Sequence, residues 1–224
     1  MIDEKYPLIE ALKKYKANFN KSQFISLPTN TNFGNLNIIW MQIVVRTESC
    51  NSEIINIYDD FYNSKKELVL NGTVDVSLEI GYKEIMKIEQ LFYWLRKTSD
   101  ELISLIFILS YFKENTRYPL KIKVSSIGEF LNKEKCFDGG FDKFKSILLT
   151  LNEISNGYKH SFINSQLNSY SGSVHPVVFA YLMKYNDSKN SAEFRSIDLK
   201  VFLKEYDDFL KFTKKYIELM YVNE

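Results

Sequence analysis

Cysteine and histidine are scarce in this sequence, and their scarcity excludes several classes of site. The 224 residues include two cysteines, Cys50 and Cys136, which are too few for a disulfide framework. We interpret both as buried or inert thiols in a reducing compartment. His160 and His175 are the two histidines, so the sequence contains no zinc-type ligand cluster. There is no Gly-rich phosphate loop either, and we expect neither a metal nor a cofactor.

The sequence also lacks an excess of charge of one sign and a long apolar run. Lys and Arg number 29 against 28 Asp and Glu, so no global field draws the chain toward nucleic acid or anionic lipid. The longest apolar run, Leu102 to Phe112, covers about half of the length that a membrane helix needs. The segment Met1 to Lys5 has no apolar core of a signal peptide. We therefore expect a cytoplasmic protein with no membrane partner.

What is present is typical of a folded domain. Hydrophobic residues make up 45% and charged residues 25% of the chain, far from the composition of disordered proteins. A chain of 224 residues can bury one sizeable core. We predict a single domain over residues 1–224.

Helical periodicity is clearest in the middle and at the end of the chain. Apolar residues three or four apart predict helices over Lys83–Tyr111, Phe141–Ser155 and Val201–Tyr221, and a shorter amphipathic helix over Tyr6–Asn18. The dipeptide Asn156-Gly157 is a helix-ending signal. The apolar stripe of the first of these helices comprises Ile88, Leu91, Leu95, Leu102, Leu105, Ile106 and Leu109.

The N-terminal third contains segments that favour β-structure. Leu36–Arg46 is rich in Ile and Val, and both of its alternating faces are apolar, which predicts a well-covered strand. Ser52–Asn63 fits a helix or a strand, and the pattern leaves both open. Leu68–Val76 predicts a β-hairpin, because Asn71-Gly72 suits a type I′ turn.

Two further β-prone runs, Val177–Tyr185 and Phe194–Leu199, follow Pro176 and are joined by a polar loop. The predicted fold class is therefore α+β, mainly a helical bundle with additional short strands and hairpins. The helical core is expected at about 83–165 and 200–221, and β-containing additions at about 36–80 and 177–199.

The strongest candidate site lies near the end of the second predicted helix. An imidazole at His160 can take or give a proton near neutral pH, and an ammonium at Lys159 can stabilise a phosphate charge. A histidine near a helix end can equally bond a terminal carbonyl, and a lysine there complements the helix dipole. The polar residues of this segment are Asn152, Glu153, Ser155, Asn156, Lys159, His160 and Ser161.

A second polar group lies on the long predicted helix. Glu89, Tyr93, Arg96 and Asp100 are spaced at i, i+4, i+7 and i+11, so they share one face. This face can be a solvated row of ion pairs. Alternatively, Arg96 and Asp100 belong to a buried polar network or a phosphate clamp.

Two long helices, the second ending in an Asn-x-x-x-His element at Asn156 and His160, resemble the HEPN superfamily of helical-bundle proteins. The HEPN motif is Arg, a polar residue, three variable residues and His, and Ser155 stands here in the arginine position. The resemblance implies RNA binding, or metal-independent RNA cleavage by paired Arg and His at a dimer interface, in a bacterial defence or toxin system. It also implies that Lys159 or Arg96 replaces the missing guanidinium.

Two functions follow from these observations. The first is a HEPN-like RNA-binding or RNA-cleaving protein, with His160 as acid and base, Lys159 as phosphate contact and Asn156 as orienting residue. Its supporting residues would be Arg96, Asp100, Asn152 and Ser155. The second is a non-catalytic module that binds a protein partner or a second copy of the chain. An exposed His160 in a cleft near Lys159 and Arg96 favours the first function, and a buried His160 favours the second.

Overall fold

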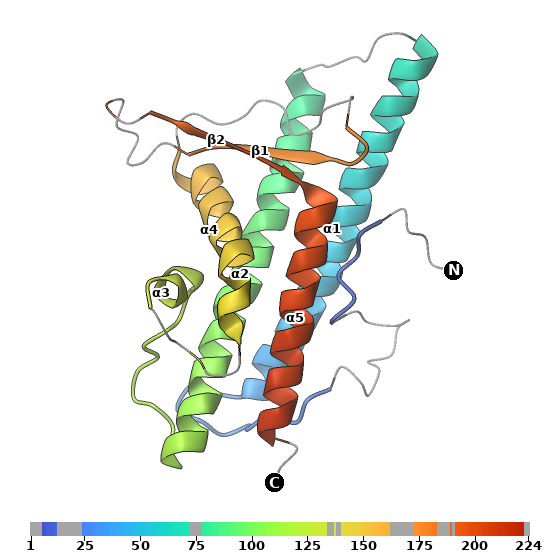
Figure 1. Ribbon diagram of the computed structural model, residues 1–224. Helices are drawn as coiled ribbons and strands as arrows, with labels where there is room; N and C mark the ends of the chain where they lie inside the picture. The colour runs from blue at the N-terminus through green and yellow to red at the C-terminus, as the bar shows by residue number, and fades with distance from the viewer. Residues whose placement is uncertain are drawn as a thin grey trace.

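The computed structural model describes residues 6–12, 24–71, 78–133, 137, 140–161, 173–182, 189 and 191–221. Within these ranges the protein is a mainly helical α+β structure, as the sequence predicts (Figure 1). Its elements are α1 (Leu36–Asn71), α2 (Leu78–Asn115), α3 (Ile127–Leu131), the 3₁₀ turn η2 (Phe141–Phe144), α4 (Lys145–His160), β1 (Val177–Leu182), β2 (Glu193–Asp198) and α5 (Leu199–Tyr221).

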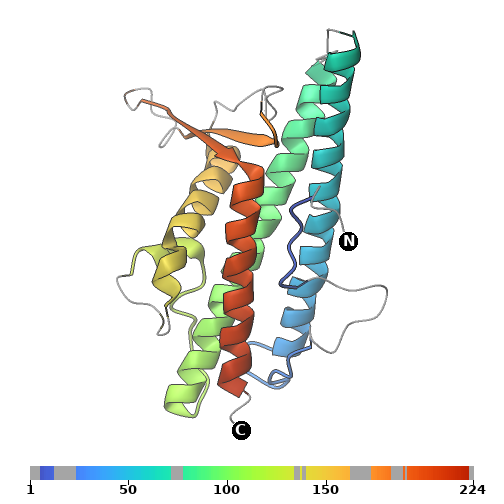
Figure 2. The same cartoon turned by 45° about the vertical axis from the view of Figure 1, so that its right-hand side comes forward.

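The long helices α1, α2, α4 and α5 lie side by side along one direction. Helices α1 and α2 form a long antiparallel pair, α5 packs beside them, and α4 lies against α2 on the other side (Figure 2). The two-stranded antiparallel sheet crosses the C-terminal end of α4 and leads directly into α5 (Figure 1). Its register pairs Val177 with Asp198 and Leu182 with Glu193.

Three of the predicted helices are confirmed, because each buries its apolar stripe. Lys83–Tyr111 lies within α2, and all seven residues of its predicted stripe are buried. Phe141–Ser155 corresponds to η2 followed by α4, and Val201–Tyr221 lies within α5. The two predicted C-terminal strands are also present, as β1 and β2.

The predicted strand at Leu36–Arg46 is wrong, because this segment is the first third of α1. Its most buried side chains are Leu36, Trp40, Ile43 and Val44, which follow a helical spacing of four and three residues. Burial of this stripe outweighs the weak β preference of Ile and Val. The ambiguous segment Ser52–Asn63 is also part of α1, so the expected β-containing addition at about 36–80 is helical wherever the structure describes it.

The predicted hairpin is wrong in its first arm, since Leu68–Asn71 forms the last turn of α1. Gly72–Val76 lies outside the described residues. Asn71 is the last residue of α1, and the next described residue, Leu78, begins α2.

The predicted helix at Tyr6–Asn18 is wrong over residues 6–12, which are not helical, and residues 13–18 lie outside the described part. Two buried side chains hold this segment instead. The Asn51 amide accepts a hydrogen bond from the Ile9 N–H (2.8 Å) and donates one to the Ile9 carbonyl (3.0 Å). The Asp207 carboxylate accepts from the N–H groups of Glu10 (2.9 Å) and Ala11 (2.7 Å). The segment is thus bonded to both α1 and α5.

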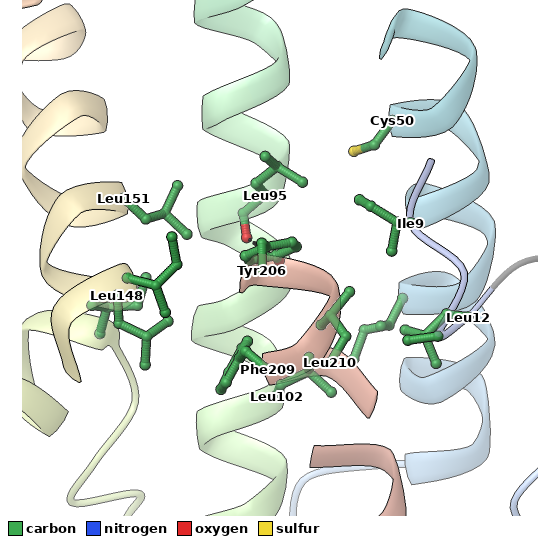
Figure 3. Packing of buried hydrophobic residues seen from close by; sticks show 14 of the residues in the cluster. Ile9, Leu12, Cys50, Leu95, Leu102, Leu148, Leu151, Tyr206, Phe209 and Leu210 are labelled. Atoms are coloured by element: carbon green, nitrogen blue, oxygen red, sulfur yellow. Dashed lines mark hydrogen bonds between the residues drawn. The ribbon is translucent and has the colours of Figure 1, made fainter. Parts of the chain in front are cut away.

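Nearly all of the described buried hydrophobic side chains form one cluster, to which every long helix contributes (Figure 3). At its centre Tyr206 of α5 donates a hydrogen bond to the Leu95 carbonyl of α2 (2.9 Å) and lies 3.1 Å from the Ser99 hydroxyl. Burial also raises the pKa of the Cys50 thiol to about 12, which keeps it protonated, as expected for an inert thiol. Cys136 lies outside the described residues.

Helix α4 does not end at Asn156-Gly157, as the sequence suggests, but continues to His160. Gly157 serves close packing instead. A Cβ atom placed there would lie 2.7 Å from Leu182 Cδ2 and 3.1 Å from the Tyr181 carbonyl oxygen, both in β1. The glycine lets the strand approach α4, and the Tyr158 hydroxyl donates to the Phe179 carbonyl beside it (2.9 Å).

Candidate functional site

A groove of about 760 Å³ runs along the outer side of α2 and is bounded on its other side by α4. Its residues on α2 extend from Met86 to Ser104, a distance of about 27 Å along the helix axis. Ser125, just before α3, lies at the Ser104 end. The groove is lined by Met86, Glu89, Gln90, Tyr93, Arg96, Lys97, Asp100, Glu101, Ser104, Ser125, Ser155, Tyr158 and Lys159.

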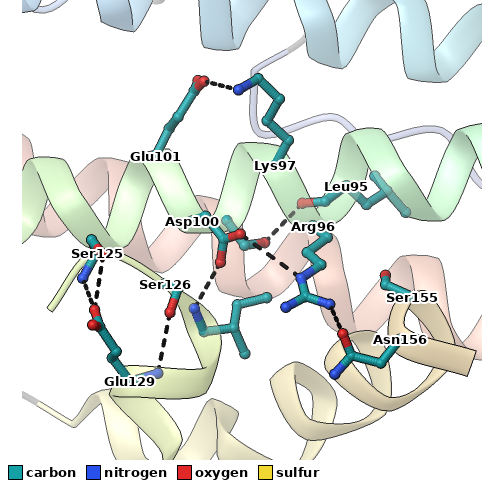
Figure 4. A network of polar contacts seen from close by, with 12 residues as sticks. Leu95, Arg96, Lys97, Asp100, Glu101, Ser125, Ser126, Glu129, Ser155 and Asn156 are labelled. Atoms are coloured by element: carbon teal, nitrogen blue, oxygen red, sulfur yellow. Dashed lines mark hydrogen bonds and ion pairs between the residues drawn. The ribbon is translucent and has the colours of Figure 1, made fainter. Parts of the chain in front are cut away.

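Arg96 connects the two walls of the groove (Figure 4). Its guanidinium donates a hydrogen bond to Oδ1 of Asn156 on α4, and its Nε lies 3.8 Å from the Asp100 carboxylate one turn along α2. The side chains of Arg96 and Asp100 are 24% and 28% exposed. Arg96 and Asp100 therefore belong to a partly buried polar network between α2 and α4.

Asp100 joins this network to α3. Its carboxylate accepts a hydrogen bond from the Ile127 N–H at the start of α3 (2.7 Å) (Figure 4). Burial raises the pKa of the Asp100 carboxyl above its usual range, although this hydrogen bond and the nearby Arg96 act in the opposite direction. The short helix α3 is thus fixed beside the groove by the same carboxylate that accompanies Arg96.

The predicted supporting residues of α4 have different environments. Ser155 is buried and its hydroxyl donates to the Phe92 carbonyl of α2 (3.3 Å). Asn156 lies one residue further round the helix and receives the Arg96 hydrogen bond. Asn152 lies one turn before Asn156, and its buried Oδ1 has no hydrogen-bond partner among the described residues. Ser155 and Asn156 therefore both join α4 to α2 through side-chain hydrogen bonds.

Lys159 and His160 occupy the last turn of α4. Lys159 lines the groove, whereas His160 is exposed and is not among the lining residues. His160 therefore meets neither expectation in full: it does not line the groove, as the first function favours, and it is not buried, as the second favours. The structure brings together Arg96, Asp100, Ser155, Asn156 and Lys159, and His160 follows Lys159 in the last turn of α4 without lining the groove.

The charges in the groove are balanced and mostly paired. Lys97 forms an i,i+4 ion pair with Glu101 (3.2 Å), as Arg96 does with Asp100. Lys159 has no ion-pair partner in the described ranges. This part of the chain therefore offers an unpaired ammonium and a guanidinium already held in place, without a strong overall positive field.

Sequence reasoning missed several lining residues, among them Lys97, Glu101, Tyr158 and Ser125. Helical spacing contained a signal for the first two, since Lys97 and Glu101 follow Tyr93 by four and eight positions on the same helix. Tyr158 lies beside the candidate segment, and its hydroxyl has its pKa raised by burial. Nothing in the local sequence connects Ser125 with α2.

Comparisons with protein-family models, with curated proteins and with solved structures found no match. No helix in the described part of the chain combines the length and the apolar character needed to cross a membrane. The described residues also contain no group of three or more His, Cys, Asp or Glu side chains placed to hold a metal ion. The geometry of the groove therefore carries the functional argument.

Proposed function

We propose that this protein is a HEPN-like RNA-binding protein whose binding site is the groove between α2 and α4. The observation that carries this proposal is the hydrogen bond from the Arg96 guanidinium to Asn156. It brings a cation from a neighbouring helix to the polar residue of the motif. The planar donor fork of a guanidinium suits a phosphodiester better than any other side chain does.

The packing of Ser155 supports the proposal that Arg96 takes over the role of the arginine that the motif has at position 155. The Ser155 hydroxyl is buried against the Phe92 carbonyl, so a long charged side chain at this position would disrupt the contact between α2 and α4. Arg96 reaches the same turn of α4 from the groove, where its guanidinium stays accessible to a ligand.

Lys159 supports a phosphate contact at the other wall. Its ammonium is exposed and has no ion-pair partner in the described ranges, so it can bind an anion without breaking an existing pair. A phosphate bound between Arg96 and Lys159 would lie near the last turn of α4, in which His160 follows Lys159. Two cations from two helices would then position one phosphodiester.

The resemblance also implies cleavage, which this arrangement would support at His160. His160 would take the proton of a ribose 2′-hydroxyl while the 2′-oxygen attacks phosphorus, and the P–O5′ bond would break. The protonated His160 would then give a proton to the leaving 5′-oxygen, so that the products are a 2′,3′-cyclic phosphate and a 5′-hydroxyl end. Arg96 and Lys159 would stabilise the charge that develops on the phosphate oxygens.

A binding experiment tests the role of the groove. We expect purified protein to bind labelled single-stranded RNA, and Arg96→Met to weaken binding about 10- to 100-fold, the equivalent of one charged hydrogen bond. Arg117→Met is the matched control, because Arg117 is exposed beyond the C-terminal end of α2 and away from the groove. Fluorescence anisotropy measures the affinity, and circular dichroism shows that both variants are folded. Equal loss in both variants would contradict the proposal.

A cleavage experiment tests His160 separately. Wild type and His160→Ala are incubated with single-stranded and transfer RNA in the presence of a chelator, and the products are separated on a denaturing gel. Cleavage by wild type and none by His160→Ala is the result expected for a nuclease. Arg96-dependent binding without cleavage by either protein would limit the proposal to RNA binding.

The second candidate function is a non-catalytic module that binds a protein partner or a second copy of the chain. Met86 and Tyr93 favour it, because they lie two turns apart in the groove and are 53% and 54% exposed. Sedimentation at several protein concentrations would show self-association that Met86→Asp abolishes. Self-association of this kind, together with no RNA binding, would replace the first proposal with this one.

A further inference from the structure

We infer that the groove takes single-stranded RNA with an unpaired base stacked on the ring of Tyr93, an inference that rests on the proposed RNA-binding function. Tyr93 lines the middle of the groove, and 54% of it is exposed to solvent. An exposed aromatic ring in a polar groove can bind the face of a nucleobase, because every base presents a π-surface.

The ring of Tyr93 is held in place by its neighbours. It meets the Trp94 ring edge-to-face with 4.9 Å between the ring centroids. The Arg46 guanidinium lies 5.7 Å from the Trp94 ring centroid, and Arg46 is itself paired with Glu101 at 2.7 Å. A supported ring loses little conformational freedom when a base stacks on it, so more of the stacking energy contributes to affinity.

The position of Tyr93 relative to the cations fits a nucleotide. Arg96 follows Tyr93 by three residues, which is about 5 Å along the axis of α2. Lys159 stands on the opposite wall of the same groove. A phosphate between Arg96 and Lys159 would therefore place a base of the same strand near the Tyr93 ring, and the groove is long enough for a few nucleotides.

The charge balance of the groove favours a single strand over a duplex. The groove is lined by three basic residues, Arg96, Lys97 and Lys159, and by three acidic residues, Glu89, Asp100 and Glu101. It therefore has no net charge to attract a phosphate backbone from a distance. A duplex hides the faces of its bases, and only an unpaired base can reach Tyr93. Two phosphate contacts on a single strand predict a slope of about −1.4 when log K is plotted against log salt concentration.

The test compares Tyr93→Ala with Tyr93→Phe, which keeps the ring and removes only the hydroxyl. The probes are oligouridine and oligoadenosine of about eight nucleotides, an abasic ribose-phosphate chain of the same length, and an RNA duplex. Leu120→Ala is a control for an exposed side chain away from the groove. Fluorescence anisotropy gives the dissociation constant of each protein variant for each probe.

We expect Tyr93→Ala to weaken binding of both oligonucleotides about tenfold, while Tyr93→Phe and Leu120→Ala bind as wild type does. The abasic chain and the duplex should bind weakly and equally to wild type and to Tyr93→Ala. If RNA binding depends on Arg96 but is unchanged in Tyr93→Ala, the base-stacking inference is wrong and the proposed function stands. If wild type binds none of the probes, both are wrong.

Discussion

Replacing Gly157 with alanine should destabilise the protein, although alanine is the better helix former. In an open helical position this substitution stabilises by about 1 kcal/mol. At Gly157 the new methyl group would lie 2.7 Å from Leu182 Cδ2, well inside the usual carbon–carbon contact distance of about 3.5–4.0 Å. It would also lie 3.1 Å from the Tyr181 carbonyl oxygen, which is backbone of β1 and cannot rotate away.

Overpacking of this kind costs about 1–3 kcal/mol, so it outweighs the gain in helix propensity. We expect a net loss of up to about 2 kcal/mol, which for a chain of this length lowers the melting temperature by up to roughly 8 °C. Gly128→Ala in α3 is the matched control, because the nearest atom to its added Cβ lies 3.9 Å away. Gly128→Ala should raise the melting temperature slightly.

Thermal unfolding followed by circular dichroism measures both variants. A double variant with Gly157→Ala and Leu182→Ala removes the shortest contact, so its loss should be smaller than the sum of the two single losses. If Gly157→Ala raises the melting temperature as Gly128→Ala does, then β1 does not pack closely on α4, and our account of this glycine is wrong.

Three further substitutions test other parts of the structure. Asn51→Ala leaves the buried N–H and carbonyl of Ile9 without their partner, and should lower the free energy of unfolding in urea by about 2–4 kcal/mol. Tyr206→Phe removes the hydrogen bond to the Leu95 carbonyl, and should lower the free energy of unfolding by about 1 kcal/mol. Burial raises the pKa of Asp100 above 3.8, so the protonated carboxyl stabilises the fold at acidic pH, and this stability is lost as pH rises through the raised pKa. The melting temperature of wild type minus that of Asp100→Asn should therefore fall as pH is raised from about 4 to about 7.

Each of these predictions has a control on the same kind of side chain at the surface. Asn56→Ala and Tyr93→Phe should change the free energy of unfolding by less than about 0.5 kcal/mol. Asp208→Asn should not reproduce the pH dependence of Asp100→Asn, because the Asp208 side chain is 59% exposed. A melting temperature difference for Asp100→Asn that is constant over this pH range would show that the carboxyl is not held in an unfavourable environment.

The helices that the sequence predicts correctly are those in which most apolar residues lie on one face, although Met86 and Tyr93 of α2 are exposed. In α1 that contrast is weak, because Ile38 and Val45 are 55% and 50% exposed on the face opposite to the buried stripe. Apolar residues all round the segment made it look like a buried strand. Only the packing against α2 decides which of its faces is the core, and that information is not local.

The candidate site was predictable in its parts and not in its assembly. Helical spacing alone places Arg96 next to Asp100, and the polar cluster at the end of α4 is visible in the sequence. The hydrogen bond between Arg96 and Asn156 joins residues 60 positions apart, so it depends on how α4 docks against α2. The predicted end of the helix at Asn156-Gly157 was wrong for a similar reason. The strand that packs against this glycine, β1, follows later in the chain.

The anchoring of residues 9–11 has a consequence for the order in which the protein folds during synthesis. Glu10 and Ala11 lie 197 and 196 residues before their hydrogen-bond acceptor, Asp207. A ribosome makes this segment long before it makes α5, so the segment can bond to Asn51 in the nascent chain but not yet to Asp207. Contacts over such a separation form slowly. Residues 9–11 should therefore be among the last parts of the chain to reach their native contacts, although they are among the first to be synthesised.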